Sequence, residues 1–439
     1  MSVIPSARLW LVNSLEVFET SLQAIFFHEA KCRGTDEHCA TSSAESRRAM
    51  KVLVAPDGFK GSIDGYQAAE AIRQGLGRVS TAIEVDCLPV TDGGDGLVDI
   101  LVQALGGNIV EVAVADPLGR LMQAGLGHIE ATGTGIVEMA RASGLVLVEE
   151  SCRNPLYTTT LGTGQLIIEC LDRGVKQLII GLGGSATCDG GIGVGQALGY
   201  RFLDRDGKEL EPVGASLGRI AAIDSTGVDQ RIFELEVEAV CDVANPLTGP
   251  RGASPVYSPQ KGAGPSEVAQ LNAGLANLAA VIRKEMGIDV EQVAGAGAAG
   301  GLGAGVIAFL GGKLRPGIEL VLDLLDFDSR LEGVDLVITG EGRIDYQTGF
   351  DKAPAGVAAA ARRAGIPCVA LAGGVEDCRG ELHRIGFDAV FSICRHPMSL
   401  EQAMANTPEL LALAAEQVIR LFLAASDKSA AAQHVDRGG

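Results

Sequence analysis

The chain has few aromatic and few basic residues. Aromatic side chains make up 4% of its 439 residues, with one tryptophan, and 36 lysines and arginines stand against 55 aspartates and glutamates. The formal charge of -19 argues against binding to nucleic acid or to an anionic membrane, because both need a positive protein surface. An anionic substrate would need a site that is locally cationic.

Paired cysteine motifs and long uninterrupted apolar runs are missing as well. The ten cysteines show no CxxC spacing, which favours a reduced, cytoplasmic protein over a disulfide-rich secreted one. A His and Cys cluster at 28–39 matches no zinc-binding spacing. Two glutamates interrupt the apolar stretch 9–27, so we expect neither a signal peptide nor a membrane span there.

Both ends of the chain differ from its bulk. Residues 1–49 contain almost no glycine-bearing turn, whereas "MKVLVAPDGFKGS", from Met50, begins directly with a buried type of strand. We expect residues 1–49 to lie outside the fold, with Met50 as the translation start. The segment 426–439 shows no periodicity, and we expect it to be disordered.

Glycine is abundant, at 59 residues, and short apolar runs alternate with alanine-rich amphipathic stretches from residue 50 onward. Runs that are apolar throughout predict strands covered on both faces, and helices at 67–76 and 409–424 separate some of them. We expect an α/β fold with a doubly wound, flavodoxin-like or Rossmann-like parallel sheet. The predicted strands are 51–55, 84–89, 177–181, 238–241, 335–339, 367–372 and 388–393.

The segment 109–150 predicts a different arrangement, because its strands are separated by turn signals rather than helices. This pattern is typical of an antiparallel sheet. We therefore expect a second α/β domain, 117–300, inserted into an open-sheet domain that is built from 50–116 and 301–425.

Five segments place glycine beside charged or hydroxyl residues just after an apolar run. In an open α/β sheet, loops past the carboxyl ends of the strands line the ligand crevice, so we expect these five to converge on one cleft. They are "APDGFKGS" (55–62), "VTDGGDG" (90–96), "GLGGSATCDGG" (181–191), "CDVANPLTGPRGA" with "SPQKGA" (241–263), and "ITGEGRIDYQTGFDKAP" (338–354).

The third segment predicts an anion site. Its glycines, among them Gly183, Gly184, Gly190 and Gly191, allow backbone N–H groups to turn towards a phosphate near a helix N-terminus. A carboxylate disfavours a nearby phosphate, so Asp189 is a candidate base or Mg²⁺ ligand. The alternative is that Asp189 caps the helix that follows.

Two further segments carry acidic residues. Asp92 and Asp95 suit a Mg²⁺ ion shared with phosphates, or are part of an ordinary Asp-Gly turn. In "TGEGRID", Arg343 can grip a carboxylate or a phosphate while Glu341 and Asp345 orient it, and the alternative is a surface network of ion pairs.

Several nucleotide-binding motifs are absent or weak. The sequence contains no GxxxxGK[ST] loop and no protein-kinase HRD or DFG set. "GAGAAG" (295–300) fits the dinucleotide-binding pattern GxGxxG, but a poor strand precedes it. Close helix packing or a substrate-side loop is the other interpretation.

Taken together and in this order, the segments resemble the type-1 glycerate kinase family of bacteria, from Met50 to about residue 425. The resemblance implies two α/β domains with the active site between them, and transfer of the γ-phosphoryl group of ATP to D-glycerate with Mg²⁺, generally giving 2-phosphoglycerate. The sequence departs from the family pattern at Gly58, Cys188, Ala244, Tyr257–Ser258 and Asp351, and Asp351 puts the position of Lys352 in doubt.

Phosphoryl transfer needs a cation clamp, Mg²⁺ and a carboxylate that takes up the hydroxyl proton. With the resemblance, we expect Lys60 and the backbone of 183–185 to hold phosphate, Asp92 and Asp95 to hold Mg²⁺, and Asp189 to act as base. Arg343 would hold the glycerate carboxylate. The expected substrate-binding residues are Ser185, Asp242, Lys261, Glu341, Asp345 and Lys352.

Two other functions stay open. One is another small hydroxy-acid or alcohol kinase, because "GLGGSA" resembles the phosphate loop of the homoserine and mevalonate kinases. The other is a non-catalytic protein that binds small anions. Under the main hypothesis we expect the protein to be a cytoplasmic monomer or homodimer that binds D-glycerate and ATP.

Overall fold

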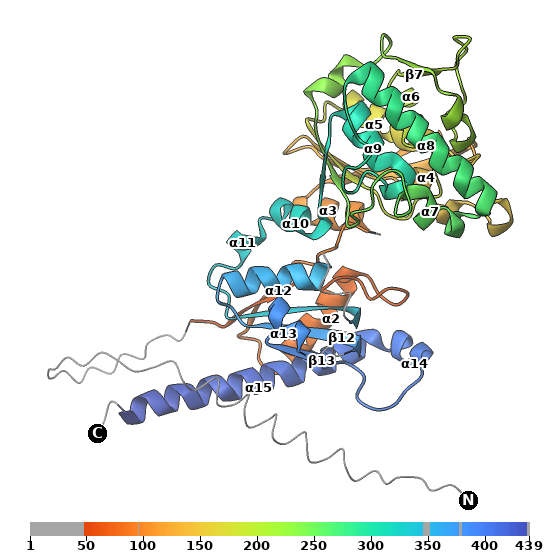
Figure 1. Ribbon diagram of the computed structural model, residues 1–439. Coiled ribbons are helices and arrows are strands. Elements are labelled where there is room, and N and C mark those ends of the chain that lie inside the picture. Colours follow the sequence, from red (N-terminus) through yellow and green to blue (C-terminus); the bar gives the residue numbers. More distant parts are fainter. Residues whose placement is uncertain (1–47, 95, 346–351, 377–379, 437–439) are drawn as a thin grey trace, which may run out of the picture. The chain divides into compact units, whose positions relative to one another are not determined.

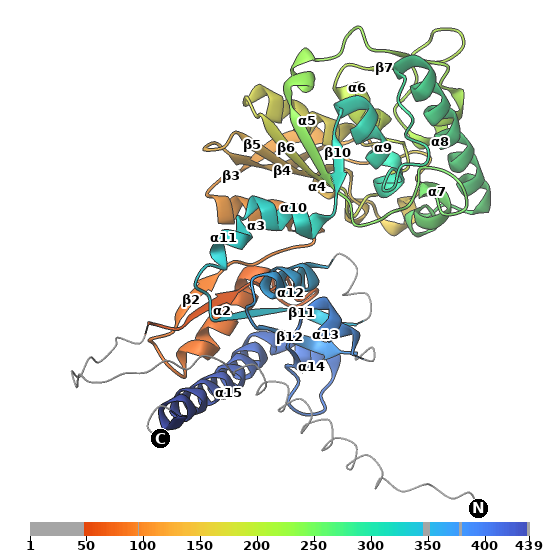
Figure 2. The same ribbon diagram turned by 60° about the vertical axis from the view of Figure 1, so that its left-hand side comes forward.

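The structure is a computed structural model that describes residues 48–94, 96–345, 352–376 and 380–436 (Figures 1 and 2). Residues from Ala49 onward form one compact unit. It contains a five-stranded sheet, a six-stranded sheet and a small two-stranded sheet.

The five-stranded sheet is parallel throughout, in the order β13-β12-β11-β1-β2. Every one of its strands overlaps a strand that the apolar runs predict, which confirms a parallel α/β sheet. The strands are β1 (Lys51–Val54), β2 (Glu84–Cys87), β11 (Leu336–Ile344), β12 (Cys368–Val375) and β13 (Ala389–Ser392).

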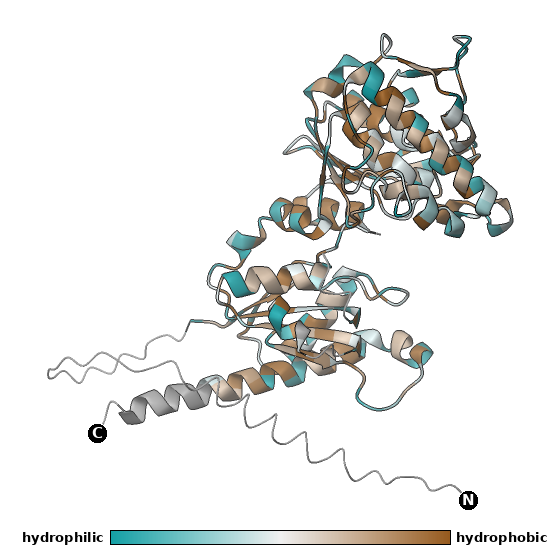
Figure 3. Cartoon of the chain, viewed as in Figure 1, coloured by the Kyte–Doolittle hydropathy of each residue, from teal (hydrophilic) through white to brown (hydrophobic). Residues whose placement is uncertain are grey.

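Helices cover both faces of this sheet. In β1, Val52 and Val54 pack against α2 (Gly65–Gly77) and α15 (Thr407–Asp436), whereas Leu53 lies in a core with α12 (Ala353–Arg363). The opposite orientation of successive strand residues explains why the whole run is apolar. Figure 3 shows the strands as largely hydrophobic.

Helix α15 packs closely against α2 and ends later in the sequence than we expected. A Cβ at Gly75 of α2 would lie 2.1 Å from the carbonyl oxygen of Ala412, so glycine lets the two helices approach backbone to backbone. The helix continues to Asp436, which differs from the disorder that we expected for 426–439. The alanines in this segment have a high helix propensity. Because the segment has no apolar periodicity, the sequence pattern did not indicate a helix there.

The six-stranded sheet has the order β10-β9-β6-β5-β4-β3. Strands β3, β4 and β5 pair antiparallel, as the segment 109–150 predicts, and the remaining pairs are parallel. The strands are β3 (Asn108–Ala115), β4 (Leu121–Ile129), β5 (Thr134–Glu138), β6 (Gln177–Gly181), β9 (Glu236–Val240) and β10 (Lys313–Arg315).

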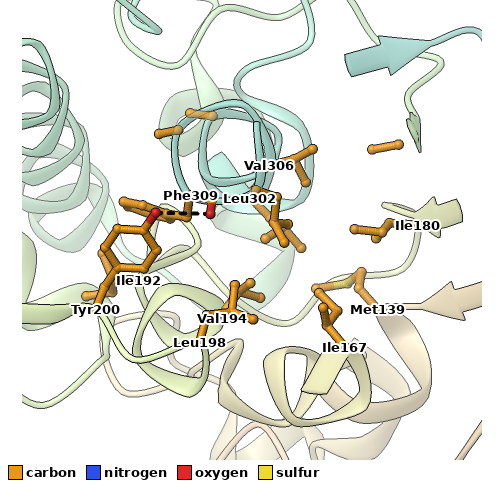
Figure 4. Close-up of a cluster of buried hydrophobic side chains, with 14 of the residues drawn as sticks. Met139, Ile167, Ile180, Ile192, Val194, Leu198, Tyr200, Leu302, Val306 and Phe309 are labelled. Carbon is orange, nitrogen blue, oxygen red and sulfur yellow. Dashed lines mark hydrogen bonds between the residues drawn. The ribbon is translucent and has the colours of Figure 1, made fainter. Parts of the chain in front are cut away.

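One face of this second sheet packs against α5 (Leu161–Asp172), α6 (Ile192–Ala197), α8 (Pro265–Met286) and α9 (Ala298–Leu310). Figure 4 shows part of this core, in which the Tyr200 hydroxyl donates to the Phe309 carbonyl oxygen over 3.3 Å. The bond satisfies the only polar atom of a largely buried ring.

The other face of the second sheet packs against α3 (Leu97–Leu105) and α10 (Gly317–Leu324), in a core that also includes residues of the five-stranded sheet. The second sheet thus extends past both predicted domain limits, since β3 lies before residue 117 and β10 after residue 300. The limits 117 and 300 are therefore not the ends of this sheet.

The remaining elements are short. They are α4 (Ala140–Ser143), α7 (Ala253–Tyr257), α11 (Phe327–Arg330), α13 (Glu381–Ile385), α14 (Leu400–Ala405), β7 (Arg201–Leu203), β8 (Ala222–Asp224), and the 3-10 helices η1 (Leu145–Leu147), η2 (Glu150–Cys152), η3 (Gly214–Arg219), η4 (Gln230–Glu234) and η5 (Pro259–Lys261). Among the described residues, no helix has the length and apolar character of a membrane span. The seven cysteines in the described ranges are all free.

Candidate active site

Three carboxyl groups lie at the carboxyl ends of parallel strands in the five-stranded sheet. Asp57 follows β1, Asp92 follows β2, and Glu341 lies in the last part of β11. The Asp57 backbone N–H donates to the Gly340 carbonyl oxygen over 2.8 Å, which ties the first of these segments to the third. Parallel strands bring their carboxyl ends to one edge, as the sequence predicts.

These carboxyl groups affect one another electrostatically. Burial, followed by the charges of Asp92 and Glu341, raises the pKa of Asp57 to about 7. The Gly58 N–H, 2.7 Å from Asp57 Oδ1, and the charge of Lys60 act in the opposite direction. The site therefore concentrates negative charge where a cation would be favourable.

Two lysines accompany the carboxyl groups. Lys60 is exposed, and Lys352, the residue before α12, places its Nζ 3.8 Å from Asp92 Oδ2. Lys352 thus lies at the site despite the unusual Asp351 before it, which is outside the described residues. We call Asp57, Lys60, Asp92, Glu341 and Lys352 the acid–lysine group.

A pocket of about 390 Å³ adjoins this group, because Gly93 and Gly94 line it directly after Asp92. Its walls come from the carboxyl-end segments of β6 and β9, from η5 and from the start of α9. We call it the glycine-lined pocket. Its lining residues are Gly93, Gly94, Leu145, Leu182, Gly183, Gly184, Ser185, Val240, Cys241, Asp242, Val243, Tyr257, Gln260, Lys261, Ala298 and Ala299.

Lys261 is the buried basic residue of this pocket, with 3% of its surface exposed. Its Nζ donates to Ser185 Oγ over 2.5 Å and to the Thr187 carbonyl oxygen over 2.7 Å. Burial lowers its pKa to about 8. Lys261 and Ser185, which are more than 70 residues apart in sequence, therefore form one polar end of the pocket.

Asp242 lies at the mouth of the same pocket and is exposed. Its Oδ1 accepts a hydrogen bond of 2.7 Å from the backbone N–H of Gly317, the first residue of α10. A Cβ at Gly317 would lie 1.7 Å from the Asp92 carbonyl oxygen, so only glycine allows this contact. Asp242 therefore connects the segment after β9, which lines the pocket, to the start of α10, which contacts Asp92 of the acid–lysine group.

Asp189, the candidate base, lies in the interior of the protein. The residue is fully buried and does not line the pocket. Oδ2 accepts hydrogen bonds from the backbone N–H and the hydroxyl of Thr160, both 2.8 Å, and from the Gly193 N–H at 3.3 Å, and Oδ1 accepts one from the Gly191 N–H at 3.1 Å. These contacts favour the alternative that Asp189 caps the following helix, whereas its role as a base stays a prediction.

The four glycines of the predicted phosphate site form two pairs, one at the pocket and one buried in the protein interior. Gly183 and Gly184 line the pocket, and their backbone is exposed. Gly190 and Gly191 are buried with φ of +64° and +78°, and a Cβ at Gly190 would lie 2.4 Å from the Leu278 side chain. Packing and backbone conformation, rather than ligand contact, explain this second pair.

The "GAGAAG" segment is a packing element rather than a dinucleotide fingerprint. It begins in the loop after α8 and its last three residues are the first of α9, so no strand leads into it. A Cβ at Gly300 would lie 1.9 Å from the Thr187 carbonyl oxygen. Ala299, at φ +51°, adopts a conformation that alanine rarely takes, and it lines the pocket.

The residues of "TGEGRID" separate in the structure. Glu341 is buried, whereas the Arg343 side chain is 67% exposed. Arg343 pairs with Glu376 at 2.5 Å and with Asp345 at 3.2 Å. An anion that binds Arg343 must therefore compete with or join an existing ion-pair network.

Only part of the predicted Mg²⁺ site lies within the described residues. Asp95 lies outside the described residues. Across the described ranges, no three His, Cys, Asp or Glu residues are close enough to form a metal-binding cluster. Asp57, Asp92 and Glu341 nevertheless offer the carboxylate oxygens that Mg²⁺ prefers, and their mutual repulsion favours a cation.

An open parallel sheet whose carboxyl ends carry acids and lysines, beside a pocket with a buried ammonium, is typical of α/β enzymes that bind small ligands. The sequence profile described as the glycerate kinase family matches residues 52–423. The chain therefore belongs to the glycerate kinase family and is an enzyme of that family.

Individual relatives agree. The chain is 45% identical to the glycerate kinase of Bacillus cereus over 379 residues, which cover 86% of this chain and all of the relative. It is 41% identical to the glycerate 2-kinase of Escherichia coli, with 84% and 97% covered. The crystal structure described as glycerate kinase 2 from Salmonella typhimurium LT2 superposes with a TM-score of 0.80 at 43% identity, covering 86% of this chain and all of that one.

Reasoning from the sequence overlooked Asp57. The residue is in the quoted "APDGFKGS", but the interpretation of that segment concentrated on Lys60. A signal was present, because Asp-Gly directly after a buried strand places a carboxylate at the carboxyl end of the sheet.

Proposed function

We propose that the enzyme transfers the γ-phosphoryl group of ATP to the 2-hydroxyl of D-glycerate, in the cytoplasm and in the service of organic-acid catabolism. The Escherichia coli relative supports the choice of the 2-hydroxyl. The observation that carries the proposal is the acid–lysine group beside the glycine-lined pocket. Two adjacent subsites of opposite character suit a reaction between two anionic substrates.

The carboxylates of the acid–lysine group offer oxygen ligands of the kind that Mg²⁺ prefers, two at a time. Asp92, with Asp57 or Glu341 beside it, would hold the ion. A bound Mg²⁺ neutralises charge on the phosphate oxygens during transfer. The accumulation of carboxylates otherwise opposes the approach of ATP, so the ion and the phosphates are expected to bind together.

The side chains of the chain supply positioning and proton uptake. Lys60 and Lys352 neutralise the transferred group, and the exposed backbone of Gly183 and Gly184 provides space for phosphate oxygens. Asp57, rather than Asp189, is the proposed proton acceptor, because burial and the charges of Asp92 and Glu341 raise its pKa to about 7. Proton uptake occurs late in such a reaction, so positioning contributes most.

Arg343 is proposed to bind the glycerate carboxylate. Its guanidinium is exposed and is oriented by Asp345, and exchanging Glu376 for the substrate carboxylate would keep its charge paired. Arg343→Lys should raise the KM for glycerate more than it lowers kcat, because a lysine cannot reproduce a bidentate contact.

The direct test is an assay of purified protein with ATP, Mg²⁺ and D-glycerate, with ³¹P NMR of the product. A signal from 2-phosphoglycerate is expected. Formation of 3-phosphoglycerate contradicts the assigned hydroxyl, and turnover of another hydroxy acid alone contradicts the substrate. Tight binding without turnover would identify an anion-binding protein instead.

A further inference from the structure

Glu138 is a buried carboxylate that belongs neither to the acid–lysine group nor to the lining of the glycine-lined pocket. It is the last residue of β5, in the second sheet. Its Oε1 accepts hydrogen bonds from two consecutive backbone N–H groups, that of Gly96 at 2.7 Å and that of Leu97 at 2.9 Å. A strand of the second sheet thus caps the start of α3, which lies about 40 residues earlier in the chain.

The start of α3 needs an acceptor from outside the helix. Its N-cap residue, Gly96, has φ of +90° and no side chain that could accept a hydrogen bond. The first N–H groups of a helix have no partner within the helix, and a buried donor without a partner is costly. Leu97 is fully buried, so solvent does not replace the acceptor there. Glu138 therefore takes the place of the missing cap, and its charge is favourable at a helix N-terminus.

Arg141 holds Glu138 in this position. Arg141 Nε donates to Glu138 Oε2 over 2.6 Å, and its guanidinium also pairs with Asp99 in the first turn of α3. The end of β5 is therefore connected to α3 through two backbone N–H groups and through one carboxylate. Solvent screens this network less than a surface ion pair, because the Arg141 side chain is only 25% exposed.

The capped end of α3 is also the end of the turn that carries Asp92. Three positions separate Asp92 from Gly96 in the sequence. At the start of the turn, Gly94 N–H donates to Asp92 Oδ1 over 3.1 Å, and at its end Glu138 holds the Gly96 N–H. Loss of the cap would leave Asp92 free to move relative to the other carboxylates of the acid–lysine group.

We infer that Glu138 is a positioning residue for phosphoryl transfer, which sets where α3 begins and thereby holds Asp92 in the acid–lysine group. This inference rests on the proposed function, in which Asp92 offers a carboxylate to the metal ion. Glu138 acts through the backbone of 92–97 and not by contact with a substrate. Residues that orient metal ligands from outside typically change metal affinity or activity by about 10- to 100-fold when they are replaced.

The test measures Mn²⁺ binding by electron paramagnetic resonance in saturating ADP, and denaturant unfolding of the same samples. Glu138→Ala should weaken Mn²⁺ binding about tenfold or more, because no acceptor then holds the two N–H groups. Glu138→Gln keeps an oxygen for these groups and should bind Mn²⁺ within about threefold of wild type. Asp92→Asn removes a proposed ligand, and its loss of Mn²⁺ affinity should be at least as large as that of Glu138→Ala.

Two further variants separate positioning from the stability of the helix. Leu101→Ala removes a fully buried side chain from α3 without touching the capped N–H groups. It should lower the denaturant midpoint but leave Mn²⁺ affinity within about twofold. Arg141→Met releases Oε2 of Glu138 at a partly exposed position and should weaken Mn²⁺ binding roughly 3- to 10-fold. This variant tests the same connection if Glu138→Ala does not fold.

The outcomes separate this inference from the proposed function. Mn²⁺ affinity at the wild-type level in Glu138→Ala overturns the inference, and so does an equal loss of affinity in Leu101→Ala, because Glu138 would then only stabilise the helix. If wild type binds no Mn²⁺, the metal role of Asp92 is wrong and the inference falls with it. If wild type does not phosphorylate glycerate while the Glu138 and Arg141 variants lose Mn²⁺ affinity as expected, the proposed function fails and the positioning role remains.

Discussion

Replacement of Asp189 distinguishes a structural cap from a catalytic base. The carboxylate lies between the starts of two helices and accepts four hydrogen bonds, three at Oδ2 and one at Oδ1. Asn can keep its oxygen at the Oδ2 position, and its amide then faces the Gly191 N–H. Ala removes all four acceptor contacts and leaves a cavity.

The magnitudes follow from the number of donors that lose their acceptor. An unsatisfied buried donor costs roughly 1–3 kcal/mol, so Asp189→Asn should lower the free energy of unfolding by about that amount. Asp189→Ala should cost at least about 4 kcal/mol. Desolvation raises the pKa of Asp189 although the four donors oppose it, so burial disfavours the charged form and the loss of that charge in Asp189→Asn is not itself expected to be destabilising.

The assay measures denaturant unfolding and kcat for the same samples at a temperature where each variant is folded. A structural Asp189 keeps kcat within about threefold in Asp189→Asn, whereas loss of a general base lowers it roughly 10²–10⁴-fold. Thr160→Val is the matched control, since it removes a donor to Asp189 without touching a carboxylate. A large fall in kcat with unchanged unfolding would refute the capping role.

Three other perturbations test the site. The pKa of Asp57 is raised from 3.8 to about 7 in the folded protein, so wild type should lose stability between pH 4 and 7. In thermal unfolding, Asp57→Asn should be more stable than wild type by up to about 4 kcal/mol at pH 8. At pH 4 the two proteins should be equally stable. Lys261 has a pKa lowered to about 8, so wild-type stability should rise from pH 8 to 10.5, and the same scan of Lys261→Met should lack that rise. Gly93→Ala should cost about 1–3 kcal/mol and lower kcat at least tenfold in steady-state assays, because its Cβ would collide with Val240.

Much of the fold could be predicted, because a strand buried on both faces consists of consecutive apolar residues that are visible in the sequence. Residues 52–54 of β1 and 336–338 of β11 are consecutive apolar residues because helices cover both faces of their sheet. The strand order could not be predicted from those runs. It depends on which strands pair across hundreds of residues, such as Val52 with Leu336, and no local pattern encodes that pairing.

The domain limits were harder to predict for a specific reason. α3 precedes the second sheet in sequence and α10 follows it, yet both pack on its Ile136 and Ile179 face within a core shared with the first sheet. An amphipathic pattern shows that a helix has a buried side but not which sheet covers it. Limits drawn between strands therefore separated these helices from one of their packing partners.

The sequence alone also could not assign separate roles to the glycines at 181–191. Glycine is required at Gly184 beside a ligand pocket and at Gly190 beside Leu278, and the sequence alone does not distinguish open space from a packed neighbour. The intervening Asp189 does, however, carry information. Left-handed glycines at a helix start expose N–H groups that need an acceptor, so a carboxylate directly before such a pair is more economically explained as their cap than as a catalyst. By that reasoning Asp57, whose carboxylate accepts a hydrogen bond from the neighbouring Gly58 alone among the described residues, is a carboxylate with capacity left for a ligand.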